Sequence, residues 1–326
     1  MEREEFTLVR DMLRTLATRL GTGSPDEAGP GTRSAAQRAV DDLGLTELRR
    51  ASPPAATVQE CALLAEEHGR RPLATALLGT ALLGPELLRL LDADGNTEGA
   101  AGARPTVALA HDLRFPGPGA TDLVAWDCAG ADAALLVDAE GRVTLVELGP
   151  PAPTADLLRG VRRASPAGRQ VGRLTPEAHQ RWQAFCLVVV ASELVGAARS
   201  FVEQSVDYAR ERHQYGRPIG SFQAVQHLLA DATVLVEACT SATRHAAWCL
   251  DSESAGRALT AARVAKAEVN TSAVEAVYAG MQVFGGIAQT WEHVAHLYLR
   301  RVLVGATLLA TTADLLPALA APEATR

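Results

Sequence analysis

The stretch YARERHQYGRPIGSFQ, residues 208–223, decides how this chain of 326 residues is interpreted. Helix-forming sequence lies on both sides of it, and its glycines and proline interrupt the helical pattern. Arg210, Arg212 and Arg217 crowd this junction. A guanidinium can hold a diphosphate through paired hydrogen bonds, and Tyr215 could stack on a flat ring. Arginines also complement the dipole at the end of a helix, so this stretch alone leaves both interpretations open.

A second stretch, QVFGGIAQTWEH at residues 282–293, has two successive glycines after an apolar helical run. Glycines there permit positive φ and let a ligand approach the backbone, but a glycine helix cap is the simpler explanation for this stretch alone. Glu292, His293 and His296 lie close together in the sequence. The HExxH pattern is absent, so we expect no metal site.

The chain around these stretches is helical in pattern from Thr175 almost to its end. Thr175 is suited to cap a helix whose first residue is Pro176. We predict four helices: one to about Arg212, one from near Ser221, one over roughly 258–284 and one from near Trp291 to about 315. Long helices with short connections predict an antiparallel four-helix bundle.

The sequence pattern changes once in the first half of the chain. Residues 1–103 have the pattern of short helices, whereas 104–174 contain the short apolar runs TVALA, DLVAW, AALLVD and VTLVELG, which are typical of strands. AEGR at 139–142 suits a hairpin turn. We therefore predict a mainly α protein with a small β-domain: an N-terminal helical domain (1–103), a shortened β-domain (104–174) and a C-terminal bundle (175–326).

Composition narrows the class of protein. The net charge of −7 argues against nucleic acid as the main partner. The five cysteines form no CxxC pair, and their spacing suggests neither a disulfide framework nor a zinc site. The acidic, amphipathic start does not resemble a signal peptide, and Asp314 and Pro317 interrupt the apolar segment 302–320. We expect a cytoplasmic protein without a membrane span.

Together, the two quoted stretches resemble the two signature regions of the acyl-CoA dehydrogenase family, in particular the bacterial branch that reads GGIGFTWEH. The resemblance is strong over 179–301, fair over the N-terminal helices and weak between them. It implies a helical N-terminal domain, a small β-domain and a C-terminal four-helix bundle. Members of the family hold FAD at a subunit interface and remove two hydrogens across Cα–Cβ of an acyl thioester.

The resemblance also assigns roles to single positions. By position, the residues expected to hold the ADP half of an FAD seated mainly in the neighbouring subunit are Arg212, Tyr215, Gln223, Gln282, Gly285 and Gly286. The chemistry of the family needs a carboxylate base. The two positions where the family places it fall here at Cys186-Leu187 and at Leu309, and neither is a carboxylate. The catalytic residue is therefore unknown.

Other departures concern the flavin ring. The β-domain is short, and its Trp-x-(Ser/Thr) and Gly-Ser-Asp elements are missing, with Trp126 the only candidate and in the wrong context. Glu193, Glu292 and Asp314 are the nearby carboxylates, with packing or surface roles as the simpler explanation.

We expect a base-lacking subunit of a hetero-oligomeric enzyme, not catalytic alone, which assists a catalytic acyl-CoA dehydrogenase partner on an acyl thioester of CoA or a carrier protein. The alternatives are a self-contained homo-oligomeric flavoenzyme with an unrecognised base and a flavin-free relic with a scaffold or non-redox role.

Overall fold

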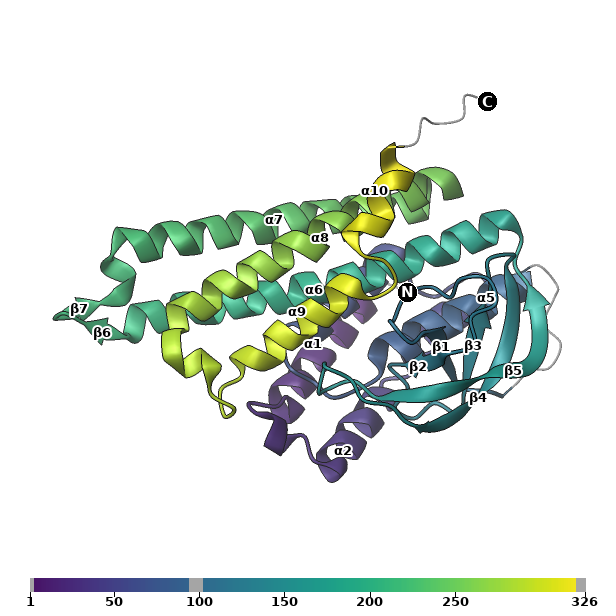
Figure 1. Ribbon diagram of the computed structural model, residues 1–326, viewed down its shortest axis with the longest axis horizontal. Helices are drawn as coiled ribbons and strands as arrows, with labels where there is room; N and C mark the ends of the chain where they lie inside the picture. Colours follow the sequence, from purple (N-terminus) through teal and green to yellow (C-terminus); the bar gives the residue numbers. More distant parts are fainter. Residues whose placement is uncertain (1–2, 94–101, 321–326) are drawn as a thin grey trace.

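The computed structural model describes residues 3–93 and 102–320 (Figure 1). Its N-terminal part is helical, as predicted. The elements there are α1 (Arg3–Leu20), η1 (Pro25–Glu27), α2 (Pro30–Asp41), α3 (Glu47–Arg50), α4 (Val58–Gly69), η2 (Leu77–Leu83) and α5 (Gly84–Ala93). Thr57 and Glu60 form a capping box that starts α4 by satisfying backbone N–H groups that the helix leaves free.

A closed barrel follows. Its strands are β1 (Pro105–Ala110), β2 (Leu123–Trp126), β3 (Ala133–Val137), β4 (Arg142–Pro151) and β5 (Val161–Arg173), in the order β1-β2-β5-β4-β3. The four predicted runs form β1 to β4, and the predicted turn joins β3 to β4, with the Gly141 N–H donating to the Asp138 carbonyl at 3.0 Å. The sequence analysis did not predict β5, because most of its side chains face solvent and are polar or small.

The C-terminal part is a bundle with a small hairpin at one end. Its elements are α6 (Pro176–Glu211), β6 (His213–Gln214), β7 (Arg217–Pro218), η3 (Ile219–Ser221), α7 (Gln223–Ser252), α8 (Ala255–Phe284), η4 (Gly285–Gln289), α9 (Ala295–Thr307) and α10 (Thr312–Ala320). The Thr175 hydroxyl accepts from the Ala178 N–H at 3.2 Å, and Gly285 at φ 65° ends α8. Both predicted caps are confirmed.

The predicted fourth helix was wrong in one respect, because it breaks into α9 and α10. At the break, the Leu309 N–H donates to the Leu113 carbonyl at 2.8 Å, and the Leu309 carbonyl accepts from the Phe115 N–H at 3.2 Å. These bonds pair the linker with the loop after β1 and hold Leu309 at φ 69°. A backbone committed to that pairing cannot continue the helical ladder.

Helix α6 is the centre of the molecule, with α4, α7, α8 and α9 packed around it (Figure 1). All of residues 184–198 are buried. Helix α4 approaches so closely that a Cβ on Gly196 would lie 1.9 Å from the Glu66 carbonyl oxygen. By length and composition α6 could cross a membrane, but 94% of its most apolar window is buried inside the protein, which is typical of a core helix.

Candidate functional site

The six residues expected to bind a nucleotide all lie at one end of the bundle, away from the barrel (Figure 1). The end of α6, the β6–β7 hairpin, the start of α7 and the end of α8 meet there. The rings of Tyr208 on α6 and Phe284 on α8 lie 4.6 Å apart, and Ala209, Leu229 and Val283 share a small buried cluster. Two stretches about seventy residues apart in sequence are thus brought side by side.

All six of these residues are exposed. Tyr215 is at the tip of the hairpin with 93% of its surface exposed, and its φ of 53° together with the φ of 79° at Gly216 makes the turn. Gln223 is the first residue of α7, and Gln282 lies in the last turn of α8. These six residues therefore form an exposed surface at the end of the bundle, called the open edge below, and the rest of the chain covers little of it.

Gly285 and Gly286 differ in what the fold demands of them. Gly285 has positive φ, so a helix cap is sufficient to explain it. Gly286 does not, and a Cβ added there would meet nothing within 4 Å. Neither the backbone nor the packing of this chain requires a glycine at 286. A bare backbone with open space beside it suits close approach by a molecule outside the chain.

The three arginines of the junction, Arg210, Arg212 and Arg217, differ in their contacts. Arg210 pairs with Asp207 at 3.2 Å, and the guanidinium of Arg217 lies 4.1 Å from the centre of the Phe222 ring. Within the described residues Arg212 has no ion pair. As the C-cap of α6 it can complement the helix dipole, and its unpaired guanidinium could equally hold an anion.

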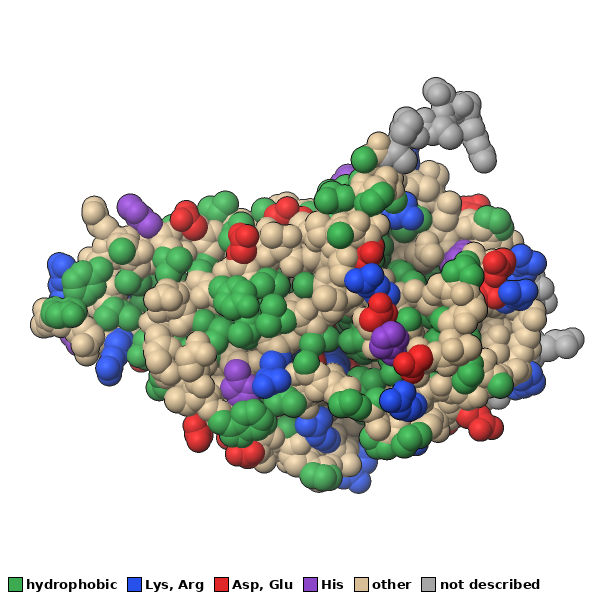
Figure 2. Space-filling view, viewed as in Figure 1, with side chains coloured by type: hydrophobic (Ala, Val, Ile, Leu, Met, Phe, Trp, Pro, Cys, Tyr) green, Lys and Arg blue, Asp and Glu red, His purple; other side chains and the backbone are tan. Residues whose placement is uncertain are grey.

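Large apolar side chains are exposed around this end of the bundle. Tyr278 lies one turn before Gln282, Ile287 and Trp291 follow Gly286, and Leu303 lies on α9; each exposes between 40% and 50% of its surface. Figure 2 shows apolar side chains gathered over the region of α8 and α9. Exposed apolar surface of this kind is typical of sites where proteins bind other molecules.

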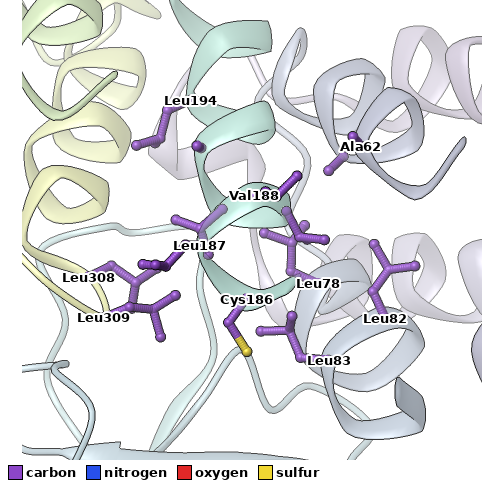
Figure 3. Close-up of a cluster of buried hydrophobic side chains, with 14 of the residues drawn as sticks. Ala62, Leu78, Leu82, Leu83, Cys186, Leu187, Val188, Leu194, Leu308 and Leu309 are labelled. Atoms are coloured by element: carbon purple, nitrogen blue, oxygen red, sulfur yellow. The ribbon is translucent and has the colours of Figure 1, made fainter. Parts of the chain in front are cut away.

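The positions at which a base was sought are part of the hydrophobic core. Cys186, Leu187 and Leu309 are 0%, 2% and 2% exposed. Figure 3 shows Leu187 beside Leu308 and Leu309, with leucines of η2 on the other side of α6. Burial raises the pKa of the Cys186 thiol, which keeps it protonated. No group at these positions can abstract a proton.

Glu193 lies in a buried network of charges instead. Its carboxylate accepts hydrogen bonds from His68 Nδ1 at 2.6 Å, from Arg301 at 3.3 Å and from Arg159. Burial alone would raise the pKa of Glu193, but the charges of Arg159 and Arg301 and the hydrogen bond from His68 outweigh it and hold that pKa well below its usual range. A carboxylate held ionised by fixed partners is a weak base.

The same network fills the junction between the barrel and the bundle. Arg159 also binds Asp127 at 2.7 Å, at the end of β2, and Arg301 of α9 binds Asp156 at 2.5 Å. The Arg159 guanidinium lies 5.2 Å from the ring centre of Trp126, which is 2% exposed. Trp126 is therefore enclosed by the protein's own side chains. The sequence analysis missed this network, because its members are single residues far apart in the chain.

The remaining carboxylates are on the surface. Asp314 caps the start of α10, accepting from the Thr311 N–H at 2.8 Å and pairing with Arg114 at 3.4 Å. Asp314 lines a surface cavity, but its carboxylate is engaged with Thr311 and Arg114, and Glu292 is exposed, so neither lies in an enclosed site of the kind that a base needs.

Comparison with known proteins identifies the family. The model of the acyl-CoA dehydrogenase C-terminal domain matches residues 188–310. Acyl-CoA dehydrogenase IpdE2 of Mycolicibacterium smegmatis is 32% identical over 251 residues, which are 77% of this chain and 74% of that protein. The chain belongs to the acyl-CoA dehydrogenase family.

Other proteins match over part of their length or in fold alone. IpdE2 of Mycobacterium tuberculosis is 39% identical over 129 residues, but the match covers 40% of this chain and 38% of that protein. The crystal structure of the ChsE4-ChsE5 complex from Mycobacterium tuberculosis superimposes with a TM-score of 0.76 at 20% identity, covering 98% of this chain and 97% of that one. Acyl-CoA dehydrogenases use FAD. The open edge, with an arginine that has no ion pair among the described residues and a glycine with open space beside it, has the chemistry to hold an anionic group such as the diphosphate of FAD.

Proposed function

We propose that this chain is the base-lacking subunit of a hetero-oligomeric acyl-CoA dehydrogenase. It contributes the residues that bind the nucleotide half of an FAD to a site shared with a catalytic partner. That partner α,β-desaturates an acyl thioester. The observation that carries this proposal is an asymmetry: the exposed, unpaired edge at one end of the bundle contrasts with base positions that are apolar and buried.

Each residue of the edge has a distinct task in this proposal. Arg212 holds the pyrophosphate through charge-assisted hydrogen bonds, and Tyr215 packs flat against a ring. The carboxamides of Gln223 and Gln282 bind polar edges of the nucleotide. Gly285 and Gly286 let the cofactor approach the backbone, which agrees with the open space beside Gly286. When bound, FAD supplies the hydride acceptor; the partner contributes the base and the surroundings of the ring.

Two further observations support a partner subunit. The exposed apolar side chains around the edge offer a surface for a second chain. ChsE4-ChsE5, whose structure has this fold, is a complex of two differently named proteins.

The two alternatives need features that are harder to find here. A self-contained flavoenzyme needs a base, and the buried carboxylate Glu193 is fully engaged with His68, Arg159 and Arg301. A flavin-free relic with a scaffold or non-redox role gives no reason for a glycine at 286.

The test is flavin content, measured by absorbance after purification of the chain alone and after co-expression with a full-length family member. We expect a colourless protein alone and a yellow, active complex. A chain that is yellow and active alone would overturn the proposal in favour of the self-contained enzyme. A colourless complex would favour the relic.

Variants of the complex sharpen this test. Arg212→Ala should weaken flavin binding by about 2–4 kcal/mol, because a charge-assisted contact is lost. Arg210→Ala is the matched control: it lies on the same helix end but pairs with Asp207, so flavin content should not change. Gly286→Ala should leave the stability of the chain alone unchanged and lower flavin content in the complex. Equal flavin content in all three variants contradicts the assigned roles.

A further inference from the structure

The connection between α8 and α9, residues 285–294, carries Gly285 and Gly286 of the open edge. Its first part is exposed, and Gly286 has open space beside it. Its second part is fixed by Ala288, which is 0% exposed, and by the contacts of Trp291. The residues after the two glycines therefore determine where these glycines lie.

Three contacts hold Trp291. Its indole N–H donates to the Asp26 carboxylate at 3.2 Å, across 265 positions of the sequence. Its ring stacks on that of His296, with the ring centres 5.0 Å apart and an angle of 17° between the planes. The Nε2–H of His296 donates to the Trp291 carbonyl at 2.9 Å. Trp291 thus joins the connection both to α9 and to η1 of the N-terminal domain, and Figure 1 shows the α8–α9 connection beside the N-terminal helices.

The two carboxylates of η1 have different partners. Glu27 accepts from the Gly23 N–H at 2.7 Å, inside the same loop. Asp26 is the one that contacts the bundle, and it forms no ion pair with any residue of 3–93 and 102–320. Its contact with the Trp291 indole is a hydrogen bond between the N-terminal domain and the part of the bundle that carries the open edge.

We propose that Asp26 and Trp291 are positioning residues for the nucleotide site, which hold the α8–α9 connection in the conformation that lets FAD approach Gly286. This inference rests on the proposed role of the open edge and extends that site to the N-terminal domain. A segment that is already held in place does not have to be ordered when the cofactor binds, so the free energy lost to ordering is smaller. Neither residue has to touch the cofactor.

The charge of Asp26 distinguishes this role from simple electrostatics. A carboxylate at this end of the bundle repels an anionic diphosphate, so removal of its charge alone would strengthen flavin binding. Loss of a positioning hydrogen bond would instead weaken it. Asp26→Ala removes both the charge and the acceptor, whereas Asp26→Asn keeps an acceptor oxygen. Only a positioning role makes the alanine variant weaker than wild type and the asparagine variant at least as strong.

The test is the dissociation constant of FAD from the complex with a full-length family member, measured by flavin fluorescence on dilution. We expect Asp26→Ala and Trp291→Phe each to weaken binding about 3- to 10-fold, which corresponds to the ordering of one side chain. The double variant should be no weaker than either single variant, because both remove the same hydrogen bond. Glu27→Gln is the matched control and should bind FAD as the wild type does.

Hydrogen exchange of the chain alone tests the positioning without flavin. Amides of residues 286–293 should exchange faster in Asp26→Ala and Trp291→Phe than in the wild type and Asp26→Asn. Thermal unfolding should be the same in all of them, because Asp26 and Trp291 lie at the surface. An effect on exchange with an unchanged midpoint is a local one.

The outcomes separate this inference from the proposed function. If Arg212→Ala lowers FAD affinity and Asp26→Ala does not, the positioning role alone is overturned. The same holds if Asp26→Asn or Glu27→Gln loses as much affinity as Asp26→Ala, or if exchange over 286–293 does not change. A wild-type complex without flavin overturns both.

Discussion

Replacing Glu193 by glutamine tests whether this carboxylate has a structural role or acts as the catalytic base. The substitution keeps the shape of the side chain and removes its charge. Glu193 is 2% exposed and accepts hydrogen bonds from His68, Arg159 and Arg301. Breaking one partner out of a buried charged network costs about 3–5 kcal/mol. Arg159 and Arg301 each keep a second carboxylate, Asp127 or Asp156, so we expect the lower end of that range, about 3 kcal/mol.

The assay is urea denaturation of the chain followed by circular dichroism. Glu237→Gln is the control: Glu237 pairs with Arg199 on the surface, and its loss should cost less than about 1 kcal/mol. The sign of the pH dependence follows from the lowered pKa of Glu193. Its contribution to stability is fully present above the ordinary carboxyl pKa of 4.5 and is lost as the pH falls below it. The difference in the free energy of unfolding between wild type and Glu193→Gln should therefore become smaller in acid.

Activity of the complex decides the interpretation. If Glu193 is structural, Glu193→Gln complexes that remain folded should retain dehydrogenase activity. A variant as stable as the wild type, to within about 0.5 kcal/mol, but without activity would refute this reasoning and identify Glu193 as the base.

Three further predictions concern the framework. Burial lowers the pKa of Lys266 to about 7, so above that pH the unfolded chain binds more protons than the folded one, and the free energy of unfolding should rise by up to about 1.4 kcal/mol per pH unit. Lys266→Met should flatten this rise, measured by urea denaturation between about pH 7 and about pH 8.5. An equal rise in both proteins would contradict the prediction. Gly196→Ala places a Cβ 1.9 Å from the Glu66 carbonyl oxygen and should destabilise the chain by about 3 kcal/mol, measured in urea; an unchanged midpoint would show that α4 and α6 can separate freely. Asp251→Ala leaves the N–H groups that start α4 without their acceptor, at 2.8 and 3.1 Å, and should cost about 1 kcal/mol, whereas Asp251→Asn should recover most of the loss.

Local chemistry allowed much of the fold to be read from the sequence alone. Thr175 and Pro176 begin α6, and Gly285 ends α8, because capping depends on the residues within one turn of the helix end. Short apolar runs separated by Gly, Asp and Pro marked β1 to β4. The missing carboxylates at Leu187 and Leu309 were visible for the same reason: side-chain chemistry is present in the sequence itself. The tasks assigned to Arg212 and its neighbours remain predictions.

Tertiary structure decided what depends on distant partners. The helix predicted over 291–315 breaks because the backbone of Leu309 pairs with the loop after β1, almost two hundred residues away. Glu193 is one residue in an apolar helix until folding brings His68 and Arg301 to it. Gly285 and Gly286 look alike in the sequence, and only the three-dimensional surroundings separate the helix cap from the glycine that the fold does not need. Sequence patterns report interactions within a turn or a strand; the packing of remote segments determines which polar groups are buried, paired or left free.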